Sequence, residues 1–138
     1  MELKKKRILV DMSATLLHHG HVRLLKKASK YGDVIVALTT DDEIKKKKGY
    51  IPELAYEYRR EILLALRYVD EVVPSNWLIN DDFLNKYNID YLVHGNDNSN
   101  PIANQKLIIF KRTEGISSSI LREKVLNVLK DIKNQGNS

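Results

Sequence analysis

Five short apolar runs, separated by segments with helical periodicity, constrain the fold of this chain more than any other feature of its sequence. Their β-branched and aliphatic residues are typical of strands that are buried on both faces. Strands of this kind, alternating with helices, build a parallel sheet. The sequence therefore predicts an α/β fold, a Rossmann-like doubly wound parallel sheet of about five strands in a single domain over residues 1–138. The expected strands are Arg7–Asp11, Val34–Leu38, Glu71–Val73, Tyr91–Val93 and Leu107–Phe110.

Helices are expected between these strands and after the last one. Gly32 is expected to end the first helix, Pro74 to end the third strand, and Asn80 to cap the helix after it. The tail over residues 135–138 is expected to fray. The expected helices are His21–Tyr31, Asp41–Lys48, Tyr56–Arg67, Asp81 to about Tyr87, and a last helix that starts near Ser117–Ser119. One apolar stripe of that last helix consists of Leu121, Val125, Val128, Leu129 and Ile132.

The composition excludes several classes of protein. With 138 residues, 43% of them hydrophobic, the chain is long enough for one domain with a buried core. The absence of cysteine excludes a disulfide scaffold, thiol catalysis and a cysteine-ligated zinc site, and it fits the cytoplasmic location that we expect. The apolar stretch behind the basic N-terminus is about four residues long, so neither a signal peptide nor a membrane span is expected.

The net charge of +5 includes two lysine clusters, Lys4–Lys6 and Lys45–Lys48. Clusters of this kind are typical of a solvated surface or of a site for phosphorylated small molecules. Aromatic residues do not alternate with these lysines as a stacking platform for nucleic acid requires. We therefore expect no nucleic-acid partner.

A pair of histidines, His18 and His21, flanks Gly20 directly after the first strand, where a helical pattern begins. Two imidazoles at this spacing, beside the free backbone N–H groups of a helix start, predict a cationic pocket that suits a nucleoside triphosphate. The same pair could bind a metal, but a metal site needs a third ligand. His94 is the only candidate, and it lacks clear ligand spacing, so no metal is expected on side chains.

Two further polar segments also follow predicted strands. Gly95–Asp97 comes after the fourth strand, and Arg112–Ser119 runs from the fifth strand into the last helix. Because ligands of doubly wound sheets bind at the carboxyl ends of the strands, these segments and the histidines are expected to meet there. Arg112 offers a planar fork for phosphate oxygens. Ser117–Ser119 offer hydroxyl donors, although serines at a helix start are also plain caps.

Taken together, these motifs resemble those of the cytidylyltransferases of the HxGH nucleotidyltransferase superfamily, most closely the small glycerol-3-phosphate cytidylyltransferase type. The resemblance runs from about Arg7 to about Lys124. It rests on Leu16-Leu17-His18-His19-Gly20-His21, Tyr56-Glu57-Tyr58-Arg59, Arg67-Tyr68-Val69-Asp70-Glu71-Val72 and Arg112-Thr113-Glu114-Gly115-Ile116-Ser117. The combination of the first and the last of these motifs is the specific signal, and in that family the last one goes with cytidylyl transfer.

The resemblance implies an enzyme that transfers CMP from CTP to a small phosphorylated or phosphonate acceptor and releases pyrophosphate. Magnesium or another divalent cation would accompany the triphosphate. His18 and His21 would donate hydrogen bonds to phosphate oxygens, while Lys48 and Arg67 would contact phosphate or acceptor. The implied nucleotide-binding residues are Met12, Ser13, Gly20, Lys46, Gly95, Asn96, Asp97, Arg112, Thr113, Ile116, Ser117, Ser118 and Ser119.

The chain departs from the family pattern in the first loop, which reads Met12-Ser13-Ala14-Thr15 where Gly-Thr-Phe-Asp is usual. A glycine that permits close backbone approach is replaced by methionine, and Thr15 replaces a carboxylate near the histidines. Asn96 stands where an acid is common. This loop is similar to that of the branch that attaches CMP to phosphonates, so the acceptor stays open between a phosphonate such as 2-hydroxyethylphosphonate, glycerol 3-phosphate and another small phospho-alcohol.

Two alternatives remain at this point: an adenylyltransferase of the same fold, and a catalytically weakened nucleotide-binding module, which the loss of an acid at Thr15 suggests. A homodimer is what the resemblance implies. The helix expected over Tyr56–Arg67 also carries more apolar residues than one face of a sheet requires.

Overall fold

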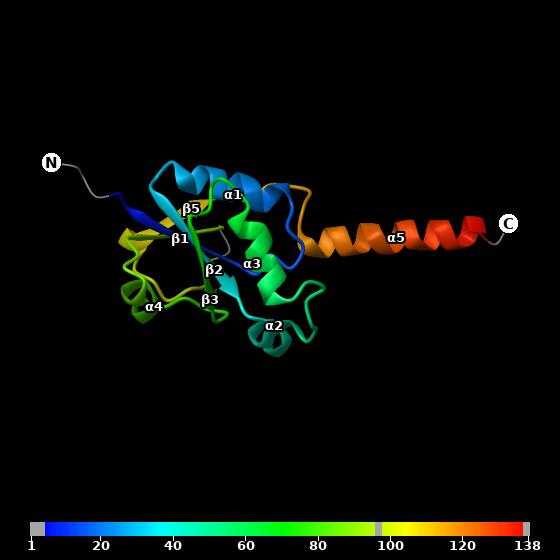
Figure 1. Cartoon of the computed structure of the whole chain (residues 1–138), viewed down its shortest axis with the longest axis horizontal. Coiled ribbons are helices and arrows are strands. Elements are labelled where there is room, and N and C mark those ends of the chain that lie inside the picture. Colours follow the sequence, from blue (N-terminus) through cyan, green and yellow to red (C-terminus); the bar gives the residue numbers. More distant parts are fainter. Residues whose placement is uncertain (1–4, 96–97, 137–138) are drawn as a thin grey trace.

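The computed structural model describes residues 5–95 and 98–136, which contain a single five-stranded sheet with the order β3-β2-β1-β4-β5 (Figure 1). Every pair of neighbouring strands is parallel. The doubly wound α/β fold predicted from the sequence is therefore confirmed. The strands are β1 (Arg7–Met12), β2 (Asp33–Thr39), β3 (Glu71–Ser75), β4 (Tyr91–Gly95) and β5 (Leu107–Phe110). The helices are α1 (His19–Ser29), α2 (Asp41–Lys48), α3 (Tyr56–Leu64), α4 (Asp81–Lys86), α5 (Ser118–Gly136) and a short 3₁₀ turn, η1 (Asn104–Lys106).

Alternate residues of the central strands build two apolar layers, one on each face of the sheet. Ile8 of β1 packs in a cluster with Leu25 of α1 and Leu63 of α3, so these helices cover one face. Leu9, the next residue of β1, packs with Leu84 of α4 on the other face. Successive residues of a strand face opposite sides of the sheet, and helices cover both sides. The strands are therefore apolar along their whole length.

The order of the strands reverses beside β1. The chain moves outward from β1 to β2 and β3, then returns to place β4 on the other side of β1. The loops after β1 and β4 therefore diverge at the carboxyl edge and leave a crevice between them, which is the usual ligand site of such sheets.

Three local expectations were wrong. Pro74 lies inside β3 instead of ending it, which is tolerated because β3 is an edge strand and pairs only with β2. Helix α1 begins at His19, two residues earlier than predicted, because the side chain of His18 caps it. Helix α3 ends at Leu64, three residues before Arg67.

Helix α5 extends away from the sheet and the other helices (Figure 1). It continues to Gly136, so Gln135 lies within the helix, while residues 137–138 of the tail expected to fray lie outside the described residues. Its apolar stripe does not reach the core, since Val125, Val128, Leu129 and Ile132 are each more than half exposed. In the part of the chain that the structure describes, no helix is both long enough and apolar enough to span a membrane.

Candidate active site

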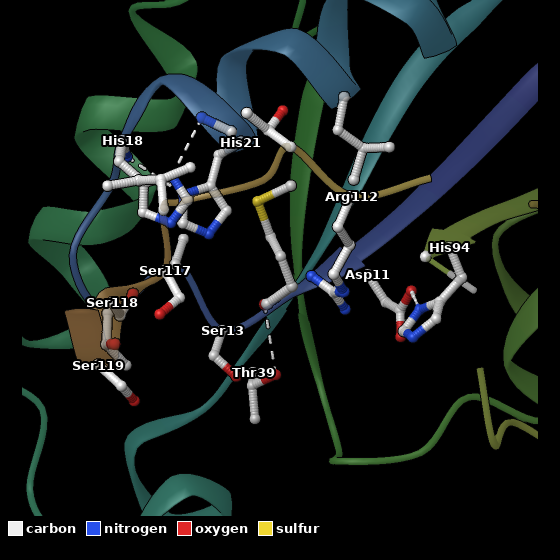
Figure 2. A pocket seen from close by; sticks show the side chains of 18 of the residues that line it. Asp11, Ser13, His18, His21, Thr39, His94, Arg112, Ser117, Ser118 and Ser119 are labelled. Atoms are coloured by element: carbon white, nitrogen blue, oxygen red, sulfur yellow. Dashed lines mark hydrogen bonds and ion pairs between the residues drawn. The ribbon is translucent and has the colours of Figure 1, made fainter. Parts of the chain in front are cut away.

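A cavity of about 370 Å³ opens at the carboxyl edge of the sheet, where β1 and β4 end. The loop after β1, the end of β4 and the segment between β5 and α5 all contribute to its walls. Figure 2 shows His18 and His21 between the Ser117–Ser119 tip on one side and Arg112 and His94 on the other. The polar segments that were expected to meet at this edge therefore share one cavity.

The two histidines are tied to the start of α1 by a reciprocal pair of hydrogen bonds. The N–H of Gly20 donates to Nδ1 of His18 at 3.1 Å, and the N–H of His18 donates to Nδ1 of His21 at 3.2 Å. These bonds satisfy N–H groups that a helix start leaves without a backbone partner. A ring nitrogen that accepts a hydrogen bond carries no proton, so each neutral ring carries its proton on Nε2. Both imidazoles therefore have an Nε2–H donor available to a ligand.

Gly20 is required by the packing of the His18 ring. A Cβ atom at position 20 would lie 2.8 Å from Cε1 and 2.9 Å from Nδ1 of His18. The same atom would lie 3.2 Å from Cγ2 of Ile116, which comes from the segment before α5. Glycine at this position thus lets the imidazole lie against the helix start and lets the two distant motifs come together.

Burial favours the neutral form of both imidazoles near pH 7, which corrects the expectation of a cationic histidine pair. Burial, followed by the neighbouring His18 and Arg112, lowers the pKa of His21 from 6.5 to about 3. Burial, followed by His19 and Arg112, also lowers the pKa of His18. The ring centroids of His18 and His21 are 3.9 Å apart, a separation at which two protonated rings would repel each other. The pair therefore provides N–H dipoles and no net charge.

The lowered pKa of His21 makes stability depend on pH. The unfolded chain binds this proton more tightly than the folded protein, so the contribution of the neutral ring is complete above about pH 6.5 and is lost as the pH falls toward 3. Between pH 7 and pH 4 we expect His21 alone to lower the free energy of unfolding by on the order of 3 kcal/mol. Urea unfolding at pH 7 and at pH 4 measures this difference in the free energy of unfolding. His21→Asn keeps an acceptor at the same place but does not titrate, so parallel curves for the two proteins would contradict this assignment.

The start of α5 is fixed beside the histidines by its serines. Oγ of Ser117 accepts a hydrogen bond from the N–H of Ile120 at 3.1 Å, which is the plain-cap role. The hydroxyl of Ser118 accepts from the N–H of Leu16 at 3.4 Å and donates to its carbonyl at 3.3 Å. These bonds join α5 to the loop that carries His18. The first turn of α5 thus presents backbone N–H groups to the cavity, an arrangement that favours phosphate.

The cationic character of the cavity comes from lysine and arginine side chains. Asp11 is the only carboxylate residue among the described residues that line it. Its acid is already engaged, since Oδ1 contacts Nδ1 of His94 at 2.5 Å and Oδ2 accepts from Nδ2 of Asn100 at 3.2 Å. The excess of positive charge favours a polyanionic ligand. The cationic lining residues are Arg23, Lys27, Lys48, Lys111, Arg112 and Arg122.

Most of the residues that the resemblance implied line this cavity, and two do not. Lys46 is exposed on α2, with its Nζ 3.9 Å from a carboxylate oxygen of Glu43. Arg67 is exposed and donates to the hydroxyl of Tyr68 at 2.9 Å. Because Arg67 lies between the end of α3 and the start of β3, it belongs to the amino edge of the sheet, opposite the cavity. The lining residues are Met12, Ser13, His18, Gly20, His21, Lys48, Gly95, Arg112, Thr113, Ile116, Ser117, Ser118 and Ser119. Asn96 and Asp97 lie outside the described residues.

The family model described as cytidylyltransferase-like matches residues 14–124, which include the histidine pair and the start of α5. The chain belongs to the cytidylyltransferase-like family. It is similar to the glycerol-3-phosphate cytidylyltransferase of Staphylococcus aureus, with 38% identity over 87% of this chain and 95% of that protein. It is also similar to the ethanolamine-phosphate cytidylyltransferase of Mus musculus, with 34% identity over 90% of this chain and 33% of that protein. The predicted family and the class of nucleotidyltransferase enzymes are confirmed.

A solved structure confirms the fold independently. The crystal structure of the lipopolysaccharide core biosynthesis protein from Thermoplasma volcanium superposes with a TM-score of 0.68 and 18% identity. The match covers 80% of this chain and 100% of that one. At this level of identity the likeness concerns the architecture of the cytidylyltransferase-like domain alone.

A cluster around Arg122 of the cytidylyltransferase-like domain was not predicted from the sequence. Nη2 of Arg122 donates to Oγ1 of Thr15 at 2.9 Å, and Arg122 makes a two-point ion pair with Glu53 through Nε (2.5 Å) and Nη2 (2.8 Å). Its guanidinium also lies 4.7 Å from the ring of Tyr50. Thr15, where the family usually has an acid, is thus hydrogen-bonded to a cationic side chain of α5. No spacing or periodicity in the sequence indicates this contact, because it joins residues from distant segments.

Proposed function

We propose that this cytidylyltransferase-like chain transfers CMP from CTP to a small phosphorylated or phosphonate acceptor. The observation that supports this most is the convergence of two Nε2–H donors and the start of α5 on one cavity rich in lysine and arginine. The relatives named for glycerol-3-phosphate and ethanolamine-phosphate cytidylyl transfer support CTP as the donor and a phosphorylated acceptor.

In this reaction an oxygen of the acceptor's phosphate or phosphonate attacks the α-phosphorus of CTP. The new P–O bond forms as the bond to the pyrophosphate oxygen breaks, so pyrophosphate leaves with the electron pair. In the transition state, negative charge is spread over the oxygens of the transferred phosphoryl group. Hydrogen-bond donors held in fixed positions stabilise that charge. His18 and His21 supply such donors through Nε2–H, and the α5 start, Lys48 and Arg112 hold the remaining phosphate oxygens.

The divalent cation belongs to the same proposal. In the described part of the chain, no three histidine, cysteine, aspartate or glutamate side chains are grouped as metal ligands. Asp11 is the only carboxylate residue among the described lining residues, and its acid is engaged by His94 and Asn100. The residues therefore do not fit a resident metal site. A cation carried by the triphosphate would neutralise part of the charge on the leaving pyrophosphate.

Release of pyrophosphate from CTP is the direct test of the proposal. The purified chain is mixed with CTP, a magnesium salt and one acceptor at a time: glycerol 3-phosphate, ethanolamine phosphate, 2-hydroxyethylphosphonate or 2-aminoethylphosphonate. We expect acceptor-dependent release with at least one of them and far less when ATP replaces CTP. Faster release with ATP would favour the alternative of an adenylyltransferase. Binding of CTP without turnover of any acceptor would favour a weakened nucleotide-binding module.

The cytoplasmic location and the homodimer remain predictions. Helix α3, on which the dimer was based, buries Leu63 against the sheet and leaves Tyr58 53% exposed. Ile62 and Leu64 are each 38% exposed. The excess of apolar residues on this helix is therefore real, and it supports contact with another chain.

A further inference from the structure

The segment between α2 and α3, residues 49–55, passes beside α5 near its start (Figure 1). We call this segment the strap. It begins at Gly49, whose φ of 80° turns the chain away from the end of α2. Close to its other end, Nε of the buried Arg59 donates to the carbonyl of Leu54 at 3.0 Å. The two ends of the strap are therefore fixed to helices, and the position of its middle depends on other contacts.

Two side chains join the middle of the strap to Arg122 of α5. Glu53 accepts from Nε of Arg122 at 2.5 Å and from Nη2 at 2.8 Å, and the ring of Tyr50 lies 4.7 Å from the same guanidinium. A single ion pair at the surface contributes little. A two-point pair beside an aromatic ring is stronger, because the planar guanidinium is held in one geometry. The contact therefore favours one position of the strap, but one substitution is enough to break it.

The guanidinium is held from the other side by Thr15. Nη2 of Arg122 donates to Oγ1 of Thr15 at 2.9 Å, and Thr15 is only 2% exposed. Thr15 comes three residues before His18, so Arg122 links the strap to the loop that carries the histidine pair. An acid at position 15 would lie against the same guanidinium and compete with Glu53 for it. Threonine offers a neutral hydroxyl and leaves the positive charge to the strap.

The strap continues directly from residues of the cavity wall. Lys48 is the last residue of α2, Tyr50 follows two residues later, and both line the cavity. Nζ of Lys48 lies 5.4 Å from the centroid of the Trp77 ring, which lines the cavity as well. Movement of the strap would displace Tyr50 and loosen the last turn of α2. Misplacement of a substrate-positioning group by about 1 Å can cost about 10²-fold in rate, so a small displacement is enough to matter.

We propose that Glu53 and Arg122 form a latch that holds the strap against α5. The latch keeps Lys48 and Tyr50 in the cavity wall, and Glu53 provides the carboxylate partner that an acid at position 15 would otherwise provide. Glu53 does not itself line the cavity, so its role is positioning. The effect of the latch on CMP transfer rests on the proposed function, whereas the latch itself does not.

Cleavage of the ligand-free chain by chymotrypsin after Tyr50 tests the latch without any turnover. We expect Glu53→Gln, and also Arg122→Lys, which cannot form the two-point pair, to speed cleavage of this bond at least several-fold. Glu57→Gln is the matched control: the same change at an exposed carboxylate of α3 is expected to leave the rate unchanged. Exchange of the two charges, Glu53→Arg with Arg122→Glu, is expected to restore protection. Equal cleavage rates for Glu53→Gln and Glu57→Gln would overturn the proposal.

Pyrophosphate release tests whether the latch positions the site. We expect Glu53→Gln to lower kcat/KM for CTP at least several-fold while the midpoint of urea unfolding stays unchanged, since a purely structural contact would move the midpoint instead. An unchanged kcat/KM would overturn the positioning role. A chain that turns over no acceptor would contradict the proposed function, but the cleavage rates would still decide whether the latch exists.

Thr15→Asp distinguishes a replaced acid from a missing one. The new carboxylate is expected to draw Arg122 away from Glu53, to speed cleavage after Tyr50 and to lower kcat/KM for CTP. Thr15→Ser keeps the hydroxyl, so we expect the strap to stay protected in that variant. Faster pyrophosphate release by Thr15→Asp than by the unchanged chain would overturn the proposal, because it would show that the site lacks an acid that Glu53 does not replace.

Discussion

Replacing His18 with asparagine is expected to lower kcat by about 10²–10³-fold while the protein keeps nearly its full stability. The imidazole of His18 has two separate roles. Its Nδ1 accepts the N–H of Gly20, and its Nε2–H is available to a phosphate oxygen. Asparagine places an oxygen where Nδ1 was and is a favoured cap, but it has no group that reaches the position of Nε2. His18→Asn therefore removes the donor and keeps the cap.

His18→Gln, the converse variant, separates the two roles of the imidazole further. His18→Gln extends an amide donor toward the position of Nε2 and loses the short acceptor, so we expect it to retain more activity than His18→Asn and to lose about 1 kcal/mol of stability. His19→Asn is the control, since His19 is exposed and does not line the cavity. Acceptor-dependent pyrophosphate release and urea unfolding measure the two effects. Equal activity of His18→Asn and His19→Asn would show that Nε2–H has no part in the reaction.

The junction of β1 and α1 shows how much of the site the sequence could predict. The apolar run of β1, the glycine and the spacing of the histidines are local features, and they placed His18 and His21 correctly at the carboxyl edge. The charge state of the two histidines, by contrast, does not follow from the local sequence. The pKa of His21 depends first on burial, so the expected cationic pair is neutral near pH 7.

The position of Arg67 away from the cavity could have been predicted from the sequence, whereas its contact with phosphate or acceptor stays a prediction. A residue between the end of a helix and the start of the next strand lies at the amino edge of a parallel sheet, away from the ligand site. The motif around Arg67 has a structural role there, because Oδ2 of Asp70 accepts the N–H of Val34 at 2.8 Å and secures the start of β2. Family resemblance alone does not separate a residue of this kind from one that contacts the nucleotide.

Contacts between distant segments were beyond prediction from the sequence. Arg122 is 107 residues from Thr15 and 69 from Glu53, and no periodicity or spacing links the three. The apolar stripe of α5 was predicted from the sequence, but periodicity shows only that one face of the helix is apolar. Whether that face meets the sheet depends on the direction in which the helix leaves the domain.

Arg59→Met is expected to lower the free energy of unfolding by about 3–4 kcal/mol, the second large effect. Arg59 is only 2% exposed, which is rare for a charged side chain. Its guanidinium donates to the carbonyls of Ser13 (2.6 Å), Thr39 (3.0 Å) and Leu54 (3.0 Å), and it pairs with Asp41 at 2.6 Å. Methionine fills a similar volume but leaves these acceptors without donors.

Arg60→Met provides the matched control, because Arg60 is the exposed neighbour on the same helix and is expected to change stability by no more than about 0.5 kcal/mol. Urea unfolding monitored through Trp77 compares the two variants. The carbonyls that Arg59 binds belong to the loop after β1, to the last residue of β2 and to the segment before α3. Because Ser13 and Thr39 line the cavity, a single buried cation holds two parts of its wall together. We therefore expect folded Arg59→Met to bind CTP more weakly as well. If its stability and CTP affinity equal those of Arg60→Met, the loops are positioned by their own backbone and not by this guanidinium.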